Sequence, residues 1–299
     1  MRLLLFIFVL TGNISNAQDL TADFSYYPKT DFSEAVVKND TSETGEIFQK
    51  IVIEGFDARF PLYLIQPKNN PQNRYVFLLH GGGGSKNSWT IPSNELTTKY
   101  VKLKDSLLSI GYAVIIPDSK YSGERSYEID FAPTGSLHNP QNGQKSINLF
   151  TTTVKDLRII MDYLESKSSE TPITFNVIGY SMGAKMAILL NSVDNRLKAV
   201  VACVPVIGAV RILNKRFGLT GTELDDKLLS VHDLFRYAKI QKAPICLLVG
   251  NTDRYYTEQE AKEFFDQITV NGKSFKIYES GHRLPESFIA DAIKYIKQN

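Results

Sequence analysis

The stretch VIGYSMGA at residues 177–184 decides how this sequence folds. It places Ser181 between two glycines, in the pattern G-x-S-x-G, after an apolar run that predicts a buried strand and before a run with helical spacing. A serine on a sharp strand-to-helix turn needs neighbours without Cβ atoms, and its Oγ then projects above the sheet beside the helix N-terminus. The pentapeptide alone also occurs in ordinary turns. Its position between a strand and a helix makes Ser181 a candidate nucleophile.

Short apolar runs rich in β-branched residues alternate with amphipathic segments on both sides of this turn. Strands are predicted at 75–79, 112–116, 173–178, 197–204, 245–249 and 275–278, after an antiparallel hairpin at 48–54 and 60–66. Helices are predicted at 94–109, 147–165, 182–191, 257–268 and 286–297. This alternation predicts an α/β fold, with a mostly parallel twisted sheet of about eight strands flanked by helices on both faces.

The chain has no internal repeat and no linker rich in glycine, proline or serine, which predicts one domain from residue 18 to residue 299. It begins with an extended arm at 18–45, which has no clear hydrophobic period. A long polar loop at 119–146 and a small insertion at 205–241, with helical patterns at 210–217 and 222–237, follow the C-terminal ends of strands. Ligands bind at these ends in open α/β sheets, so both segments are candidate pocket walls.

The first 17 residues predict a secretory signal peptide. Arg2 precedes an apolar run from Leu3 to Leu10, and a small-x-small site ending at Ala17 precedes Gln18. The apolar run is less than half of the roughly 20 residues that a membrane-spanning helix needs. We therefore expect export to the periplasm or the medium, with no stable membrane insertion after cleavage.

Composition matches an ordinary globular protein, with 43% apolar and 22% charged residues. The formal net charge is +2, and the lysines and arginines are scattered along the chain. This pattern argues against nucleic-acid binding, which needs a basic patch or stripe. Cys203 and Cys246 each lie in an apolar run, where we expect small buried hydrophobes and no disulfide.

A nucleophilic serine requires a histidine base and an acid that orients the base. Of the four histidines, His282 stands directly after the last predicted strand, and Asp253 follows the strand at 245–249. The order Ser181, Asp253, His282 is the one expected for a nucleophile elbow and its partners. Three groups at three strand ends can converge.

The other candidates for these roles are weaker. His80 ends a strand ahead of a glycine run, where a structural role is expected, and His138 and His232 lie in the two irregular segments, where surface or supporting roles are expected. Asp118 also follows a strand, but it precedes the serine, and we interpret it as a helix or turn cap.

A glycine run, HGGGG at residues 80–84, follows an early strand. Acyl transfer needs backbone N–H groups that face the developing oxyanion, and glycines allow close approach. Gly82 is the first choice for this donor and Gly83 the next, with the N–H of Met182 as the second donor. The competing interpretation, a phosphate-binding loop, lacks the Gly-Lys-Ser/Thr ending, because Ser85 precedes Lys86.

Four motifs together make the sequence resemble the α/β-hydrolase superfamily over residues 48–299: HGGGG at 80–84, GYSMG at 179–183, GNTD at 250–253 and SGH at 280–282. It is more loosely similar to small esterases of the dienelactone-hydrolase type and their secreted relatives, whose usual nucleophile is cysteine. The resemblance implies that Ser181 is the nucleophile, Asp253 the acid and His282 the base. It also implies an oxyanion hole from the backbones of Gly82 and Met182, and no metal or organic cofactor.

The sequence departs from this pattern at two places. Ala184 stands where many members have a further glycine, and Lys185 then puts a charge early in a helix that packs on the sheet. We expect Lys185 to reach the surface with its stem buried, the alternative being that it lines the site. The insertion after Val204 is shorter than the lids of many lipases, which disfavours a lipase.

Five residues are candidates for substrate contact: Trp89, Tyr121, Arg125, Tyr180 and Tyr255. Aromatic rings on loops at the catalytic edge can stack on an aryl or sugar group, or they can pack under the loops themselves. Arg125 can contact an anionic substrate, or it can pair with Glu124 in solvent.

The motifs favour an exported serine hydrolase that cleaves carboxylic esters of small or carbohydrate-linked substrates. One alternative is a serine peptidase of the prolyl-oligopeptidase type, which is disfavoured because the chain has no second domain to gate access. Another is a catalytically silent α/β-hydrolase fold used for binding. The complete set of Ser181, Asp253, His282 and the glycine run disfavours this last alternative.

Overall fold

The computed structural model describes residues 20–68, 73–138, 140–168, 172–218 and 223–299. The predicted signal peptide lies outside these residues. Among the described helices, none has the length and apolar character needed to cross a bilayer.

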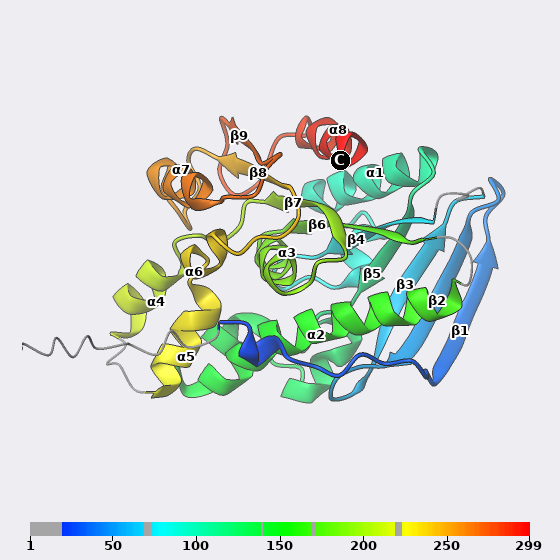
Figure 1. Ribbon diagram of the computed structural model, residues 1–299, viewed down its shortest axis with the longest axis horizontal. Helices are drawn as coiled ribbons and strands as arrows, with labels where there is room; N and C mark the ends of the chain where they lie inside the picture. Colours follow the sequence, from blue (N-terminus) through cyan, green and yellow to red (C-terminus); the bar gives the residue numbers. More distant parts are fainter. Residues whose placement is uncertain (1–19, 69–72, 139, 169–171, 219–222) are drawn as a thin grey trace, which may run out of the picture.

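One nine-stranded sheet runs through the described residues, in the order β1-β2-β3-β5-β4-β6-β7-β8-β9 (Figure 1). The strands β1 to β3 and the pair β3 and β5 are antiparallel, and all other neighbours are parallel. The predicted α/β fold with a mostly parallel sheet is confirmed. The strands are β1 (Glu34–Thr41), β2 (Ile47–Glu54), β3 (Arg59–Gln66), β4 (Arg74–Leu79), β5 (Ala113–Pro117), β6 (Thr174–Tyr180), β7 (Leu197–Cys203), β8 (Ile245–Gly250) and β9 (Ser274–Tyr278).

The predicted N-terminal arm is wrong over part of its length, because β1 pairs with β2 and adds a strand to the sheet. All residues of β1 after Glu34 are exposed, so the strand has no buried face and no apolar alternation to reveal it. Only the residues before β1 run along the surface. They carry a short 3-10 helix (Ala22–Phe24) and follow the long helix α2 (Figure 1).

Helices cover both faces of the sheet, and a separate apolar core lies under each layer. On one face α1 (Glu95–Ser109) and α8 (Phe288–Gln298) lie side by side (Figure 1). The other face carries α2 (Gly143–Lys167), α3 (Met182–Val193) and α7 (Glu258–Gln267). Both layers pack on β6, whose residues are nearly all buried. This central strand delivers its C-terminal end to the edge where the functional groups meet.

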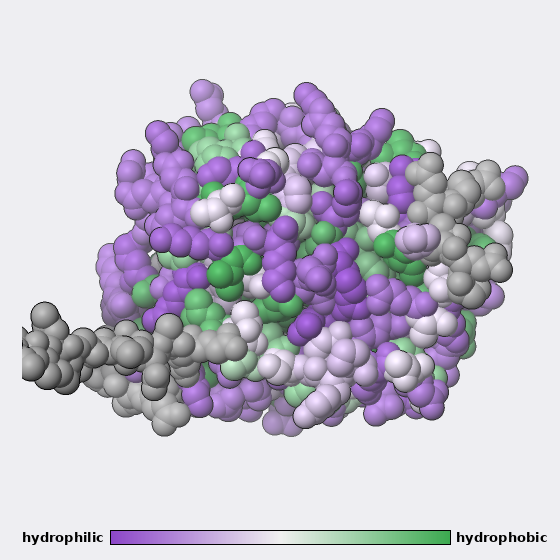
Figure 2. All heavy atoms as spheres, in the orientation of Figure 1, coloured by the Kyte–Doolittle hydropathy of each residue, from purple (hydrophilic) through white to green (hydrophobic). Residues whose placement is uncertain are grey.

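Short helices occupy the two irregular segments. The predicted loop contains η3 (Gly123–Ile129), η4 (Thr134–His138) and η5 (Pro140–Asn142), and α2 begins within its last residues. The insertion contains α4 (Ala209–Phe217), α5 (Glu223–His232) and α6 (Phe235–Ala238). The face of the molecule in Figure 2 is mostly hydrophilic, with hydrophobic residues in small separate groups.

Candidate active site

Ser181 forms the sharp turn between β6 and α3. Its backbone has φ 55° and ψ −111°, a conformation that non-glycine residues rarely adopt. A Cβ atom on Gly179 would lie 2.1 Å from the carbonyl oxygen of Gly183, and one on Gly183 would lie 2.3 Å from that of Leu79. Both positions therefore require glycine, which lets β4, β6 and α3 approach closely enough to lift the serine above the sheet.

The structure brings together the three residues that the sequence places at separate strand ends. His282 Nε2 lies 2.7 Å from Ser181 Oγ, and His282 Nδ1 lies 2.7 Å from Asp253 Oδ2. The Asp253 side chain is fully buried and also accepts the N–H of Tyr255. With the carboxylate accepting a hydrogen bond from Nδ1–H, Nε2 is the ring nitrogen left to accept the Ser181 hydroxyl proton.

Tyr180 holds the histidine loop, so the expectation that it contacts substrate is not supported. Its ring is buried, and its hydroxyl donates to the carbonyl oxygen of His282 at 3.0 Å and accepts the N–H of Leu284 at 2.9 Å. Burial raises the pKa of this phenol well above its ordinary value, so the hydroxyl keeps its proton. The residue next to Ser181 thus fixes the backbone that carries His282.

Two backbone N–H groups near Ser181 lack an acceptor in the described part of the chain. Met182 is the first residue of α3, where an N–H has no partner within the helix. Gly82 lies on the cavity beside Ser181, and its N–H makes no hydrogen bond to a described residue. Gly83, the other glycine considered for an oxyanion hole, donates its N–H to Thr134 Oγ1 at 3.2 Å. That contact leaves Gly82 and Met182 as the available pair.

The buried ring of His80 supports the backbone of the glycine run. It is fully buried, its Nδ1–H donates to the carbonyl oxygen of Gly81 at 2.9 Å, and its Nε2 accepts the N–H of Ser119 at 3.3 Å. Burial lowers the pKa of His80, which keeps the ring neutral for both contacts. Its position corresponds to the structural role expected from the sequence.

A cavity of about 910 Å³ opens onto Ser181 and His282. The helix α4 of the insertion forms one wall, where Ala209, Ile212 and Leu213 line the cavity. No aspartate or glutamate is among the described lining residues, whereas Lys185, Arg216, Arg254 and Arg283 are. The insertion thus lies where we expected a pocket wall, and the cavity carries positive charge.

The expectation that Lys185 reaches the surface is wrong. Its side chain is buried, its Nζ lies 2.7 Å from His232 Nδ1, and it stands 3.8 Å above the ring of Phe150. His232 Nε2 in turn lies 3.1 Å from Ser146 Oγ. Burial without a carboxylate in direct contact holds the pKa of Lys185 well below its ordinary value. The alternative interpretation, that Lys185 lines the site, agrees with its place in the lining of the cavity, but nothing in the sequence identified His232 of α5 as its partner.

A second cavity, of about 510 Å³, adjoins the first. The glycine run, Tyr121 and Tyr255 contribute to its lining, and Gly82, Gly135 and Tyr255 line both cavities. The ring of Tyr255 also contacts the ring of His282, with 4.6 Å between centroids. Of the five candidates for substrate contact, Tyr121 and Tyr255 are the two that line a cavity here.

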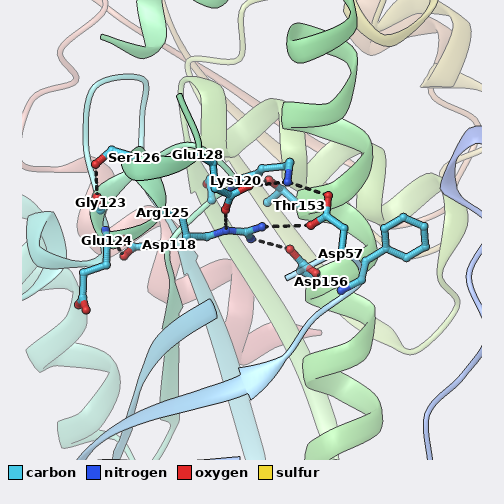
Figure 3. A network of polar contacts seen from close by, with 12 residues as sticks. Asp57, Asp118, Lys120, Gly123, Glu124, Arg125, Ser126, Glu128, Thr153 and Asp156 are labelled. Carbon is cyan, nitrogen blue, oxygen red and sulfur yellow. Dashed lines mark hydrogen bonds and ion pairs between the residues drawn. The ribbon is translucent and has the colours of Figure 1, made fainter. Parts of the chain in front are cut away.

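Trp89 and Arg125 pack inside the protein, and the expectation that they contact substrate is corrected. Trp89 is fully buried and stacks on Tyr100, with 4.3 Å between ring centroids. Arg125 is fully buried, and its guanidinium pairs with Glu128 of η3 at 2.8 Å and with Asp156 of α2 at 2.7 Å (Figure 3). The alternative from the sequence, an ion pair between Arg125 and Glu124 in solvent, is also not among the described contacts of Arg125.

The described residues offer few side chains for metal binding or for thiol chemistry. No cluster of three or more histidine, cysteine, aspartate or glutamate side chains there could hold a metal ion. Cys203 and Cys246 are free and buried, and burial raises the pKa of both thiols, that of Cys246 to about 12.

A mostly parallel sheet covered by helices, with a serine on a strand-to-helix turn beside a histidine and an aspartate, defines an α/β-hydrolase. The model of the dienelactone hydrolase family matches residues 60–283, and the chain belongs to this family.

Solved structures of similar fold include esterases. Acetyl xylan esterase 1 from Thermoanaerobacterium sp. JW/SL YS485 superimposes with a TM-score of 0.69 at 15% identity, over 94% of this chain and 93% of that one. A cold-adapted esterase from an Arctic intertidal metagenomic library gives 0.64 at 19% identity, over 88% and 97%. Est1E from Butyrivibrio proteoclasticus, solved with ferulic acid, gives 0.57 at 15% identity, over 80% and 94%.

No curated protein sequence matches the chain significantly. Family membership and these neighbours make the protein an enzyme, a hydrolase that acts on carboxylic esters.

Proposed function

We propose that the protein is an exported serine esterase that works through an acyl-enzyme on Ser181. One observation carries the proposal: the hydrogen-bonded row from Ser181 through His282 to Asp253 faces a cavity that also contains the open N–H group of Gly82. The row supplies an activated nucleophile, and the N–H groups of Gly82 and Met182 supply donors for the charge that develops on the substrate.

In this mechanism the Ser181 hydroxyl gives its proton to His282 Nε2 as Oγ attacks the ester carbonyl carbon. Gly82 and Met182 donate to the resulting oxyanion. The imidazolium, stabilised by Asp253, then protonates the leaving alkoxide, and the acyl group stays on Ser181. Water loses a proton to His282 as it attacks the acyl carbon. The bond from that carbon to Ser181 Oγ then breaks, His282 returns the proton to Oγ, and the carboxylic acid and the free serine are released.

The substrates that we propose are esters of small or carbohydrate-linked alcohols. A neighbour in fold is named as an acetyl xylan esterase, and another was solved with ferulic acid, which supports this class. Export is proposed from the signal peptide pattern at residues 1–17. Cell fractionation followed by N-terminal sequencing tests it. A chain that is not exported and still begins with Met1 contradicts the proposal.

Labelling with a fluorophosphonate tests the nucleophile. Wild type should be labelled, Ser181→Ala should not, and its kcat on 4-nitrophenyl acetate should fall by about 10⁴-fold or more. Ser109→Ala, which changes an exposed serine on α1, is the matched control and should behave like wild type. Equal labelling of wild type and Ser181→Ala would remove Ser181 from this role, and faster cleavage of a prolyl amide than of any ester would indicate a peptidase.

A further inference from the structure

The backbone that carries His282 is not held in the way that the backbone at Ser181 is. Ser181 donates its N–H to the carbonyl oxygen of Cys203 in the neighbouring strand at 2.8 Å. Among the described backbone–backbone hydrogen bonds none involves residues 282–284, and these residues belong to no helix or strand. Since buried peptide groups need partners, side chains have to supply them here.

Two side chains from distant elements supply these partners, and both bind Leu284. Tyr180, at the end of β6, accepts the N–H of Leu284 and donates to the carbonyl oxygen of His282. Lys99 of α1 donates from Nζ to the carbonyl oxygen of Leu284 at 3.0 Å. Leu284 is fully buried, so its peptide groups cannot exchange these partners for water. The two side chains thus fix both peptide groups of a residue two positions after the base.

Lys99 is itself held in place for this contact. It is buried, and its Nζ pairs with Glu95 Oε1 at 2.7 Å, one turn earlier on α1. An ammonium group has three donors, so the ion pair leaves others for Leu284. The next residue of α1, Tyr100, packs edge-on against the ring of Tyr180, with 5.2 Å between centroids. This turn of α1 therefore contacts both the loop of the base and the residue before the nucleophile.

Tyr180 connects the nucleophile to the base by a short path. Its own peptide group continues into Ser181, and its phenol holds the peptide group of His282. The ring is buried and contacts Phe288 at 5.8 Å between centroids, in addition to Tyr100, so packing fixes its position. The separation of Ser181 Oγ and His282 Nε2 therefore depends on this phenol.

That separation matters for the rate, because a misplacement of about 1 Å can lower the rate about 10²-fold. Asp253 binds His282 at Nδ1 and thereby orients the imidazole ring. It does not bind the backbone of the loop. The place of that backbone, and with it the distance from His282 to Ser181, is left to Tyr180 and Lys99.

We propose that Lys99 and Tyr180 are positioning residues for the base, which together keep His282 within hydrogen-bond distance of Ser181. The inference rests on the proposed function of Ser181 and His282, and it adds the residues that set the distance between them.

Tyr180→Phe removes the phenol oxygen and keeps the ring. Its kcat on 4-nitrophenyl acetate should fall about 10- to 100-fold with KM within about twofold of wild type, and its rate of fluorophosphonate labelling should fall by a similar factor. The matched control is Tyr295→Phe, because Tyr295 is also buried and its phenol donates to the carbonyl oxygen of Gly272 at 2.7 Å, outside both cavities. Tyr295→Phe should lose stability as Tyr180→Phe does, but it should keep the kcat of wild type.

Lys99→Met tests the second contact. Its kcat should fall about three- to tenfold, again with KM unchanged, because Tyr180 still holds the loop. Lys102→Met is the matched control. Lys102 joins α1 to Glu286 by an exposed ion pair, and its described side-chain contacts reach no peptide group of residues 282–284. This variant should keep the kcat of wild type.

The proton NMR signal of the His282 Nδ1–H, which a short hydrogen bond to Asp253 moves downfield, gives a readout that does not depend on turnover. It should stay sharp in both control variants and broaden in Tyr180→Phe. An unchanged kcat in Tyr180→Phe and Lys99→Met, or an equal loss in their controls, overturns the positioning role while the esterase function stands. A wild-type protein that cleaves no ester and takes up no fluorophosphonate loses the proposed function and this inference with it.

Discussion

At the scale of single residues, Ser181 combines reactivity with backbone strain. Its positive φ places Oγ above the sheet, where His282 can reach it. For a residue with a Cβ atom, however, this backbone conformation lowers the stability of the fold. Such strained positions cost about 1–3 kcal/mol each.

Exchanging the serine for glycine should separate strain from chemistry. Ser181→Gly and Ser181→Ala should both be inactive, but Ser181→Gly should be more stable by about 1 kcal/mol, because the relief of strain exceeds the extra entropy of an unfolded glycine. Urea unfolding of the two variants measures this difference. A glycine variant that is less stable than the alanine variant would show that the turn is not strained.

Lys185 should make the stability of the enzyme depend on pH. Its pKa lies well below that of an unfolded lysine, so the unfolded chain binds more protons between the two values, and stability rises with pH across that window. Lys185→Met removes the penalty for a buried charge. The variant should therefore melt a few degrees above wild type at pH 6, and the difference should shrink toward pH 10.

Thermal denaturation across this pH range, with Lys262→Met on the exposed side of α7 as the control, provides the measurement. A pH-independent difference between Lys185→Met and wild type would mean that Lys185 is charged in the fold at all of these pH values.

Motifs predicted the site residues that have a chemical signature, and missed those that act through packing. Ser181, Asp253 and His282 were identified because each follows a strand in a recognisable order. The roles of Tyr180 and Thr134 were not, because each depends on a contact with a segment far away in the chain. Sequence spacing carries no information on such contacts.

At the scale of elements, largely buried ion pairs join the segment with η3 to α2. Arg125 pairs with Glu128 and Asp156, and Lys120 joins Glu128 to Asp57 from the β2–β3 hairpin (Figure 3). Because this segment walls the second cavity and supplies Thr134 to the glycine run, the network supports both cavities from outside.

Breaking the network should be costly. Arg125→Met leaves the buried Asp156 carboxylate without its cation, which should destabilise the fold by about 3–5 kcal/mol. Arg211→Met, which breaks the more exposed pair with Glu260, should cost less than about 1 kcal/mol. Chemical denaturation of both variants gives the comparison, and similar losses would contradict a special role for the Arg125 network.

The regular elements were predictable and the irregular ones were not. Every predicted strand from 48 to 278 exists, with ends that differ by at most about two residues, because apolar runs in a buried sheet are continuous. The short 3-10 helices between β5 and α2 escaped prediction, since they bury few apolar residues and form no period. β1 was not predicted either, because it has no buried face.

At the scale of the whole molecule, the segment before β1 ties the N-terminal part of the chain to the helical layer over the sheet. Phe24 is fully buried and contacts Tyr237 of α6, and Tyr26 donates to Asp162 of α2 at 2.9 Å. Cleavage after residue 17 would leave all of these contacts in place.

A chain that begins at Gln18 should therefore be fully stable, and one that begins at Glu34 should lose stability. Removing the buried Phe24 ring alone should cost about 3–5 kcal/mol. Thermal denaturation of the two chains tests this expectation. Equal midpoints would show that the segment contributes nothing to the fold.

The exposed strand β1 also bears on how the enzyme behaves at high concentration. It forms one open edge of the sheet, and its unpaired backbone groups could recruit a strand from another molecule. Its pairing shifts register between Val36 and Lys38, and charged Lys38 and Asp40 follow on the exposed strand. A register shift and charged side chains make strand addition less favourable, so we expect this edge of the sheet to resist pairing with a strand of another molecule.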